Sequence, residues 1–293
     1  SVGVPSNIVT NTVDAKRGGT VSYGVGNDGA NTLSLSLSTG LTKNGWAMSV
    51  LFSKRWGDGY IQGTGYEGYN WFVNVSKRIN DDHQLSLTAF GAPQKHNQRK
   101  PLYAGLSIEG WNEVAKWTGE KNKYRYNAIY GFDNNGKERS SMVNEYHKPQ
   151  ISLNHQWQID YKSSLSTALY VSIGRGSGYS GQGRTSADRA MWNGSSNGQL
   201  LYNFRKTDGT FDYGAIQDMN AASADGSRMV MSKSLNNHMW YGLLSTYTNE
   251  LLPGLELSAG VDFRYYVGEH TNEIIDLYDG AYFIDDADRK NVK

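Results

Sequence analysis

The sequence predicts an all-β fold, an antiparallel transmembrane β-barrel. Three observations lead to it. Apolar and polar residues alternate strictly over many short segments, the connections between those segments are alternately short and long, and Gly and Tyr are abundant whereas Pro is scarce (34 Gly, 20 Tyr and 5 Pro in 293 residues). No apolar run approaches the roughly 20 residues of a spanning helix, so a membrane-spanning form of this chain must use strands.

The alternating segments predict about nine strands. They cover residues 19–26, 31–41, 45–56, 69–79, 84–91, 151–159, 165–173, 238–248 and 255–267. The pair Asn44-Gly45 between the second and third strands is typical of a tight hairpin.

Each strand has one apolar face and one polar face. Leu33, Leu35 and Leu37 alternate with serines, and the same two-residue period continues through the later strands. The apolar face suits lipid and the polar face suits a wet or plugged lumen. The residues predicted to face lipid are Leu35, Val50, Val73, Leu87, Leu169 and Val261.

The lengths of the connections predict two different rims. Short turns follow strands two, four, six and eight, whereas longer segments follow strands three, five and seven, with two long loops at about 92–148 and 174–236. Loops of that length are anomalous inside a compact soluble domain. An alternating series places all short turns on one rim and all long loops on the other, as in outer-membrane barrels, whose long loops are extracellular.

Aromatic residues near the strand ends agree with two membrane interfaces. Trp46 and Trp157 lie near the short turns, where amphipathic rings favour the headgroup region. The corresponding residues near the long loops are Trp56, Tyr69, Trp71 and Trp240. A soluble β-sandwich could use the same aromatic residues in its core.

Composition and charge exclude several classes of function. A formal net charge of +1 gives no global electrostatic reason for binding nucleic acid. The chain has no cysteine, which rules out disulfides, thiolate metal sites and cysteine nucleophiles within it. The six histidines form no HxH or HExxH pair, so no metal site or cofactor is predicted.

Two short motifs have ordinary interpretations. "FDNNGKE" (132–138) resembles a calcium loop but lacks the twelve-residue spacing, so we interpret it as a turn. "GRGSGYSGQGR" (174–184) has no Lys-Ser/Thr ending for phosphate binding, so we interpret it as a flexible loop root. No nucleophile, base and acid stand in a recognisable order, and the sequence predicts no enzyme.

The long loops carry the residues best suited to binding. Residues 94–148 hold ten Lys or Arg against six Asp or Glu, and residues 174–236 hold seven against five. Basic and aromatic side chains on loops can capture dilute polar solutes, although the same side chains could simply pack the loops together. The predicted ligand contacts are Arg99, Trp111, Trp117, Arg189 and Trp192.

Four stretches resemble TonB-dependent outer-membrane receptors. "IVTNTVDAKRGGTVSYGVGNDGANTLSLSLSTGL" resembles the junction between the last plug strand and the first barrel strand of that family. Three further stretches resemble successive barrel hairpins: "RWGDGYIQGTGYEGYNWFVNVSKRINDDHQLSLTAFGAPQKHNQR", "HKPQISLNHQWQIDYKSSLSTALYVSIGRGSGYSG" and "NNHMWYGLLSTYTNELLPGLELSAGVDFRYYVGEHTNEIIDLYDGAYF".

The resemblance implies a barrel of about 22 strands, of which this chain supplies about nine. Residues 1–18 correspond to the end of the plug domain and the plug-to-barrel junction, and residues 19–293 to the amino-terminal portion of the barrel. The TonB box, most of the plug and most of the barrel are expected outside this sequence.

The implied function is uptake of a nutrient ligand across the bacterial outer membrane. The implied partners are the TonB energy-transducing complex acting through the plug, a small nutrient ligand, outer-membrane lipid and a surface lipoprotein. Two alternatives stay open: a passive or structural outer-membrane barrel, and a soluble carbohydrate-binding β protein that uses its loop aromatics as a platform.

Overall fold

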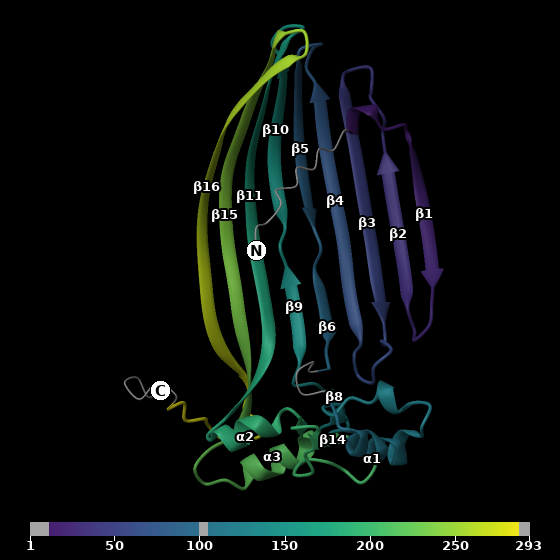
Figure 1. Cartoon of the computed structure of the whole chain (residues 1–293), viewed down its shortest axis with the longest axis vertical. Coiled ribbons are helices and arrows are strands. Elements are labelled where there is room, and N and C mark those ends of the chain that lie inside the picture. Colours follow the sequence, from purple (N-terminus) through teal and green to yellow (C-terminus); the bar gives the residue numbers. More distant parts are fainter. Residues whose placement is uncertain (1–11, 100–104, 287–293) are drawn as a thin grey trace.

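The computed structural model describes residues 12–99 and 105–286, and its main feature is one large antiparallel sheet. In order across this sheet the strands are β1 (Gly18–Val25), β2 (Asn31–Ser38), β3 (Trp46–Gly57), β4 (Tyr66–Arg78), β5 (His83–Gly91), β10 (Gln150–Gln158), β11 (Ser163–Gly183), β15 (Met229–Leu252) and β16 (Leu255–Asp276). Figure 1 shows them as a curved wall with β1 and β16 at its edges. The predicted nine-strand antiparallel order is confirmed.

Two of these strands continue past a proline as short extensions. β6 (Gln94–Asn97) follows β5 beyond Pro93, and β9 (Val143–His147) precedes β10 across Pro149. The register is the same on both sides of each proline. On β4, for example, Trp71 pairs with Gly91 before Pro93, and Gly68, three residues earlier on β4, pairs with Gln94, three residues later on the partner strand. Each proline therefore removes one backbone donor from the ladder without shifting the register.

The turns after β2, β4, β10 and β15 are short and lie at one rim, the upper end of the wall in Figure 1, whereas the short turn between β1 and β2 (26–30) lies at the other rim. They span residues 39–45, 79–82, 159–162 and 253–254. Gly45 shows why the hairpin signal works: its φ is +76°, and a Cβ there would lie 2.4 Å from the carbonyl oxygen of Arg78.

The other rim carries a folded cap. It contains α1 (Ile108–Thr118), η2 (Lys123–Arg125), β7 (Gly131–Phe132), β8 (Glu138–Arg139), α2 (Ser186–Met191), β12 (Ser195–Ser196), β13 (Gln199–Leu200), β14 (Phe211–Asp212) and α3 (Tyr213–Ala221). Figure 1 shows this cap across the lower end of the wall. None of the helices in the described part of the chain is long and apolar enough to span a membrane.

The last three strands are longer than the alternation predicts, and this corrects the predicted loop ranges. β11 runs to Gly183, β15 begins at Met229 and β16 runs to Asp276. The segments between strands are therefore 98–142 and 184–228 rather than 92–148 and 174–236. The glycine-rich stretch 174–184, interpreted above as a flexible loop root, lies almost wholly within β11, where it makes regular pairs with β15.

Register aligns the apolar residues of all central strands into rows on one face, here called the outer face. One row runs through Met48, Val75, Leu87, Leu153, Leu169, Leu243 and Phe263. The side chains of Leu87, Leu169 and Val261 are exposed (49%, 51% and 61%), while Leu35, Val50 and Val73 on the same face are partly exposed. Large apolar side chains thus cover the outside of the wall instead of a core.

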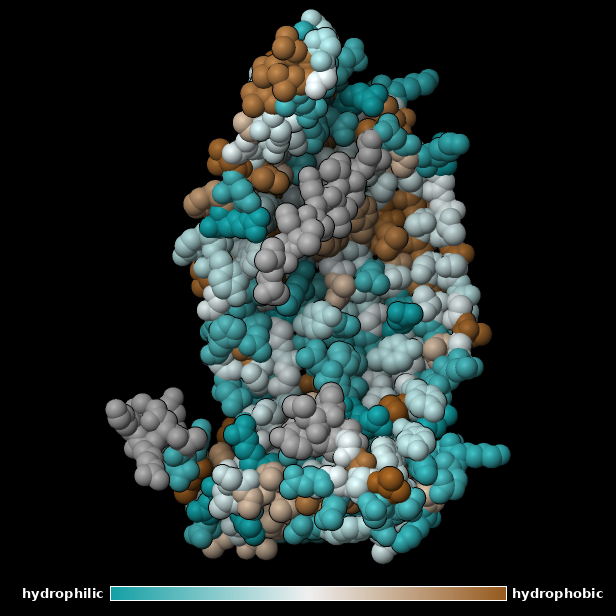
Figure 2. Space-filling view, viewed as in Figure 1, coloured by the Kyte–Doolittle hydropathy of each residue, from teal (hydrophilic) through white to brown (hydrophobic). Residues whose placement is uncertain are grey.

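The opposite side, here called the inner face, is polar. Asn74 donates to the hydroxyls of Ser86 (2.8 Å) and Thr88 (2.7 Å), and it accepts from Ser76 (2.7 Å). All four side chains are buried, with the residues of η1 (Thr12–Asp14) near β3 and β4. In Figure 2 the middle of the wall is mainly hydrophilic. A sheet that buries polar groups on one face and exposes leucines on the other is inverted relative to a soluble sandwich.

We expect Leu169→Arg to destabilise the protein by about 2 to 4 kcal/mol in a bilayer, because it places a charge on the outer face near the midplane. Ala168→Arg, one residue away on the inner face, is the matched control and should cost much less. Denaturant unfolding in lipid vesicles measures both. Equal losses for the two variants would contradict the assignment of the faces.

Candidate ligand-binding site

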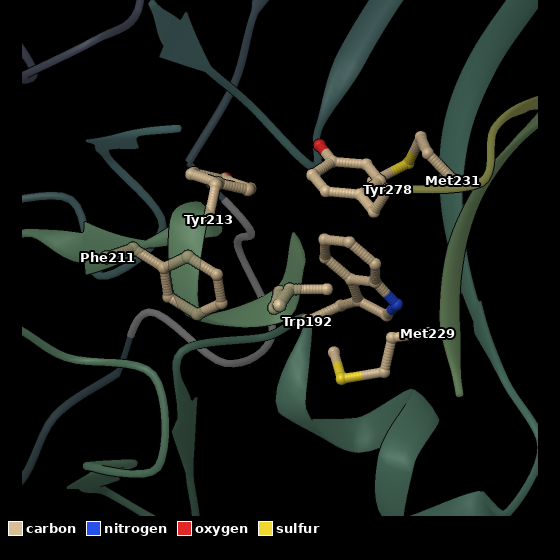
Figure 3. Close-up of a cluster of buried hydrophobic side chains, with 7 residues drawn as sticks. Trp192, Phe211, Tyr213, Met229, Met231 and Tyr278 are labelled. Carbon is tan, nitrogen blue, oxygen red and sulfur yellow. The ribbon is translucent and has the colours of Figure 1, made fainter. Parts of the chain in front are cut away.

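The cap is held together by two clusters of buried side chains. The first consists of Trp192, Phe211, Tyr213, Ile216, Met229, Met231 and Tyr278. Figure 3 shows these rings and thioethers converging from the cap and from the ends of the long strands. Met229 and Met231 belong to β15, so this cluster fastens the cap to the wall.

Hydrogen bonds fix the aromatic members of this first cluster. The Tyr213 hydroxyl donates to the carbonyl of Ile129 (2.6 Å) and accepts from the amide of Ser141 (3.1 Å). The Trp192 indole donates to the carbonyl of Gln182 in β11 (2.9 Å). Both polar ends are satisfied, as buried Tyr and Trp require.

The second cluster contains Val114, Tyr126 and Leu200, with Trp111 and Trp117 packed against it. Beside it, Arg205 joins both halves of the cap. Its guanidinium donates to the Tyr126 hydroxyl (2.6 Å), and the rest of its donors reach carbonyl oxygens at 2.7–3.0 Å. The carbonyls belong to Ala128, Gly194, Leu201 and Gly209. One cation therefore satisfies four backbone acceptors that no helix or sheet uses.

Burial governs the ionisation of this pair. Desolvation lowers the pKa of Arg205, and it raises the pKa of Tyr126 to about 12. Both groups stay protonated at neutral pH, because a guanidinium begins from a pKa far above neutrality. Their role in the cap is to donate hydrogen bonds.

A second polar link ties the cap to the end of β16. Arg139 donates to Asp133 (2.8 Å) and to Asp276 (3.1 Å). The other carboxylate oxygen of Asp133 accepts the amides of Asn135 and Lys137 (both 2.9 Å), which forms the turn between β7 and β8. The stretch 132–138 is therefore a turn, as predicted. Burial opposes ionisation of Asp133, but these hydrogen bonds outweigh it and hold its pKa below the usual value.

The five predicted contact residues fall into two groups. Arg99, Trp111 and Trp117 lie at the second cluster, where Arg99 donates to the carbonyls of Tyr124 (3.0 Å) and Tyr126 (3.3 Å). Arg189 and Trp192 lie at the first cluster. The structure does not bring all five around one cavity. Trp192 is only 3% exposed, so most of its ring packs within the cap, and it also borders the cavity beside Arg189.

Arg189 borders a cavity of about 400 Å³ between α2 and the end of β11. The Arg189 side chain is exposed, and the wall of the cavity is rich in hydroxyl and amide groups. The polar lining residues are Ser141, Tyr179, Ser180, Ser186 and Asn193. A single cation above hydroxyl groups suits a small anionic or polyhydroxylated ligand.

The inner face of the wall holds aromatic residues that the sequence did not reveal as a group. His238 stacks on Tyr266 (centroids 6.1 Å apart), and Trp240 meets Tyr266 edge-on (5.4 Å). Tyr170 lies next to them, over Gly242, where a Cβ would come within 2.0 Å of its ring. These four residues, the inner aromatic cluster, present ring faces to the lumen side.

Trp240 therefore does not belong to the outer aromatic girdle, which corrects the prediction. It pairs with Ser172, whereas its neighbour Tyr241 pairs with Val171 in an outer row. Position along a strand placed Trp240 near the long-loop end, but only parity decides which face a side chain takes. Leu243 is on the outer face, and Trp240 lies an odd number of residues from it, so the alternation of side chains already places Trp240 on the inner face.

In the ranges 12–99 and 105–286, no group of three or more His, Asp or Glu residues could hold a metal ion. The chain also matches no family model and no curated protein.

Among solved structures, the barrels of outer-membrane receptors share the fold of this wall. The ferric-catecholate import receptor Fiu from E. coli K12, in its open form, aligns with a TM-score of 0.57 at 12% identity, over 92% of this chain and 38% of its own. The ferripyoverdine receptor of the Pseudomonas aeruginosa outer membrane aligns at 0.54 and 12% identity, over 87% of this chain and 28% of its own. The ferric citrate transporter FecA aligns with a TM-score of 0.53 at 12% identity, over 85% of this chain and 28% of its own.

These alignments confirm, at the level of fold, the resemblance to TonB-dependent receptors that the sequence predicts. The chain spans only 28% to 38% of the length of these three proteins. Its nine strands therefore correspond to part of their barrels.

We expect Arg205→Met to loosen the cap by on the order of 2 to 4 kcal/mol, because four carbonyls each lose a hydrogen bond. The carbonyls of Gly194 and Gly209 keep a second donor, the Leu201 amide and the Tyr126 hydroxyl. Arg189→Met removes an exposed cation from the same cap and is the control. Amide hydrogen exchange of residues 105–142 and 184–228 reports the change. Unaltered protection in Arg205→Met would show that the guanidinium does not hold the cap.

The Asp133 turn should weaken in acid. Because the pKa of Asp133 in the folded cap lies below its ordinary value of 3.8, its contribution is complete above that value and is lost as pH falls through the folded pKa. Protection factors of the Asn135 and Lys137 amides, measured down a pH series, test this. Asp133→Asn should abolish the acid-dependent step, and a step that persists in this variant must come from another group.

Proposed function

We propose that this chain is part of an outer-membrane receptor that imports a ferric complex with TonB-coupled energy. The observation that carries the proposal is the inverted wall, apolar outside and polar inside, with the fold of three proteins that are import receptors or transporters. Such a wall satisfies its backbone only in a closed barrel, which the resemblance provides through strands outside this sequence. The same neighbours support a transport role and not an enzymatic one.

The ligand route runs, in this proposal, from the cap to the inner face. Arg99, Trp111, Trp117 and Arg189 are the loop contacts, with Trp192 holding their scaffold in place. The inner aromatic cluster then offers ring faces along the wall. Planar aromatic ligands gain roughly 0.5 to 1.5 kcal/mol per ring pair beyond burial, so the cluster favours catecholate-type complexes over purely aliphatic ones.

The test uses the complete receptor in cells, with ferric catecholate, ferripyoverdine and ferric citrate as labelled probes. Uptake of one probe should require both the receptor and TonB. Trp240→Ala combined with Tyr266→Ala should weaken its binding roughly tenfold, which corresponds to about 1.4 kcal/mol. Tyr241→Ala, on the outer face, is the matched control.

Two outcomes would count against the proposal. Uptake that continues without TonB would indicate a passive barrel, and binding of carbohydrate by detergent-free protein would indicate a soluble β protein. Unchanged affinity in the correctly folded Trp240/Tyr266 variant would remove the inner aromatic cluster from the route.

A further inference from the structure

The outer face of the wall is hollowed where it leaves the apolar rows. A groove of about 760 Å³ crosses β4, β6, β9, β11, β15 and β16, and most of its side chains belong to the outer face. Ile173, Met239 and Val267 form the end of the groove farther from the cap, in the row that begins with Phe52 and Trp71. Charged residues form the end nearer the cap.

Two strand-interior prolines lie beside the groove. Pro93 and Pro149 interrupt neighbouring strands at almost the same height, since Gln94 pairs with Tyr146 and Phe90 pairs with Gln150. Their carbonyls still accept bonds, from Tyr69 (2.8 Å) and Ile173 (3.3 Å), but neither proline donates one. The ladder is weakened on both strands, which is where a sheet bends most easily.

The groove lies near the end of β15 that carries the cap. Along β15, residues Met239, Asn237, Leu235 and Lys233 follow one another on the outer face, and Met231 and Met229 continue the same alternation. The last two are members of the first buried cluster, which joins this end of β15 to the cap. The groove therefore lies between the apolar rows and the cap-bound end of β15.

Only some of the charged side chains that line the groove form ion pairs. Glu67 and Glu145 already face Lys54 (3.0 Å) and Lys233 (3.7 Å). Arg175 and Lys95 are exposed and make no ion pair within 4 Å in the described part of the chain, and Glu269 is the one acidic lining residue in the same state. Arg175 stands two residues beyond Ile173 on the same face, on the cap side of the apolar row.

We propose that this groove binds a phosphorylated glycolipid of the outer leaflet, with its acyl chains on Ile173, Met239 and Val267 and a phosphate on Arg175 and Lys95. The proposal rests on the outer-membrane placement in the proposed function. A guanidinium at the boundary between apolar and charged surface can hold a phosphate through paired hydrogen bonds. The apolar floor is continuous with the lipid-facing rows, which favours a lipid over a free ion or a soluble protein.

The experiment uses the complete receptor in phosphatidylcholine nanodiscs with and without lipid A. Arg175→Ala with Lys95→Ala should reduce retained lipid A about tenfold, because both phosphate contacts are lost, and added salt should weaken retention by the wild type more than by the variant. Lys43→Ala with Lys162→Ala removes the same charge at the opposite rim and should retain lipid A like the wild type. Arg175→Lys keeps the positive charge but loses the two-pronged guanidinium, so its retention of lipid A should lie between that of the double groove variant and that of the control.

Two further readouts separate the possible failures. A cysteine placed by Thr207→Cys in the cap of this cysteine-free chain should react with an impermeant reagent on intact cells; no reaction would refute the outer-membrane placement itself. With labelling intact, equal lipid A retention by the groove variant, the control and the wild type would overturn the glycolipid site alone. Capture of a protein on this face, with lipid A retention unaffected, would also overturn it. Heat-modifiable gel mobility checks folding, and Lys95→Ala alone serves if the double variant misfolds.

Discussion

The wall depends on one constraint: inside a hydrocarbon layer, every backbone N–H and C=O must find its partner in a neighbouring strand. Alternating side chains follow from that constraint, because a strand paired on both sides can vary only in what it points to each face. The continuous strand order from β1 to β16 shows the result. Only the prolines at 93 and 149 remove donors within it in the described strands, on the cap side of the rows of leucine and valine, where the outer face becomes charged.

The cap solves a different problem with different means. It has little regular sheet, so its backbone acceptors must be satisfied by side chains. Arg205 does this for four carbonyls, and Tyr213 and Trp192 do it for two more. The surface residues of such a cap can change while the buried hydrogen-bond donors that hold its backbone stay the same. This is what is expected of binding loops on a rigid frame.

Sequence reasoning succeeded where a two-residue period exists and failed where it ends. The alternation of apolar and polar residues locates the centres of all nine strands. It also assigns side chains such as Leu87 and Leu169 to the outer face, where both pair with Leu153. The extension of β11 past Ile173 was missed, since Arg175 and the alternate glycines break the apolar signal although the backbone stays extended. Trp192 was predicted as a ligand contact because an aromatic residue on a loop looks the same in sequence whether it faces solvent or a core.

The glycines opposite aromatic rings have a consequence for how the wall is assembled. Tyr170 pairs with Gly242 and His238 pairs with Gly174, so each ring lies flat on a position without a side chain. Sliding β11 along β15 by two residues would keep every face correct, yet it would press Tyr170 against Trp240 or Leu244. Hydrophobic patterning alone cannot reject that slip. These two ring–glycine pairings fit in one register only, and they therefore fix the alignment of β11 with β15, two of the three longest strands in the described part of the chain.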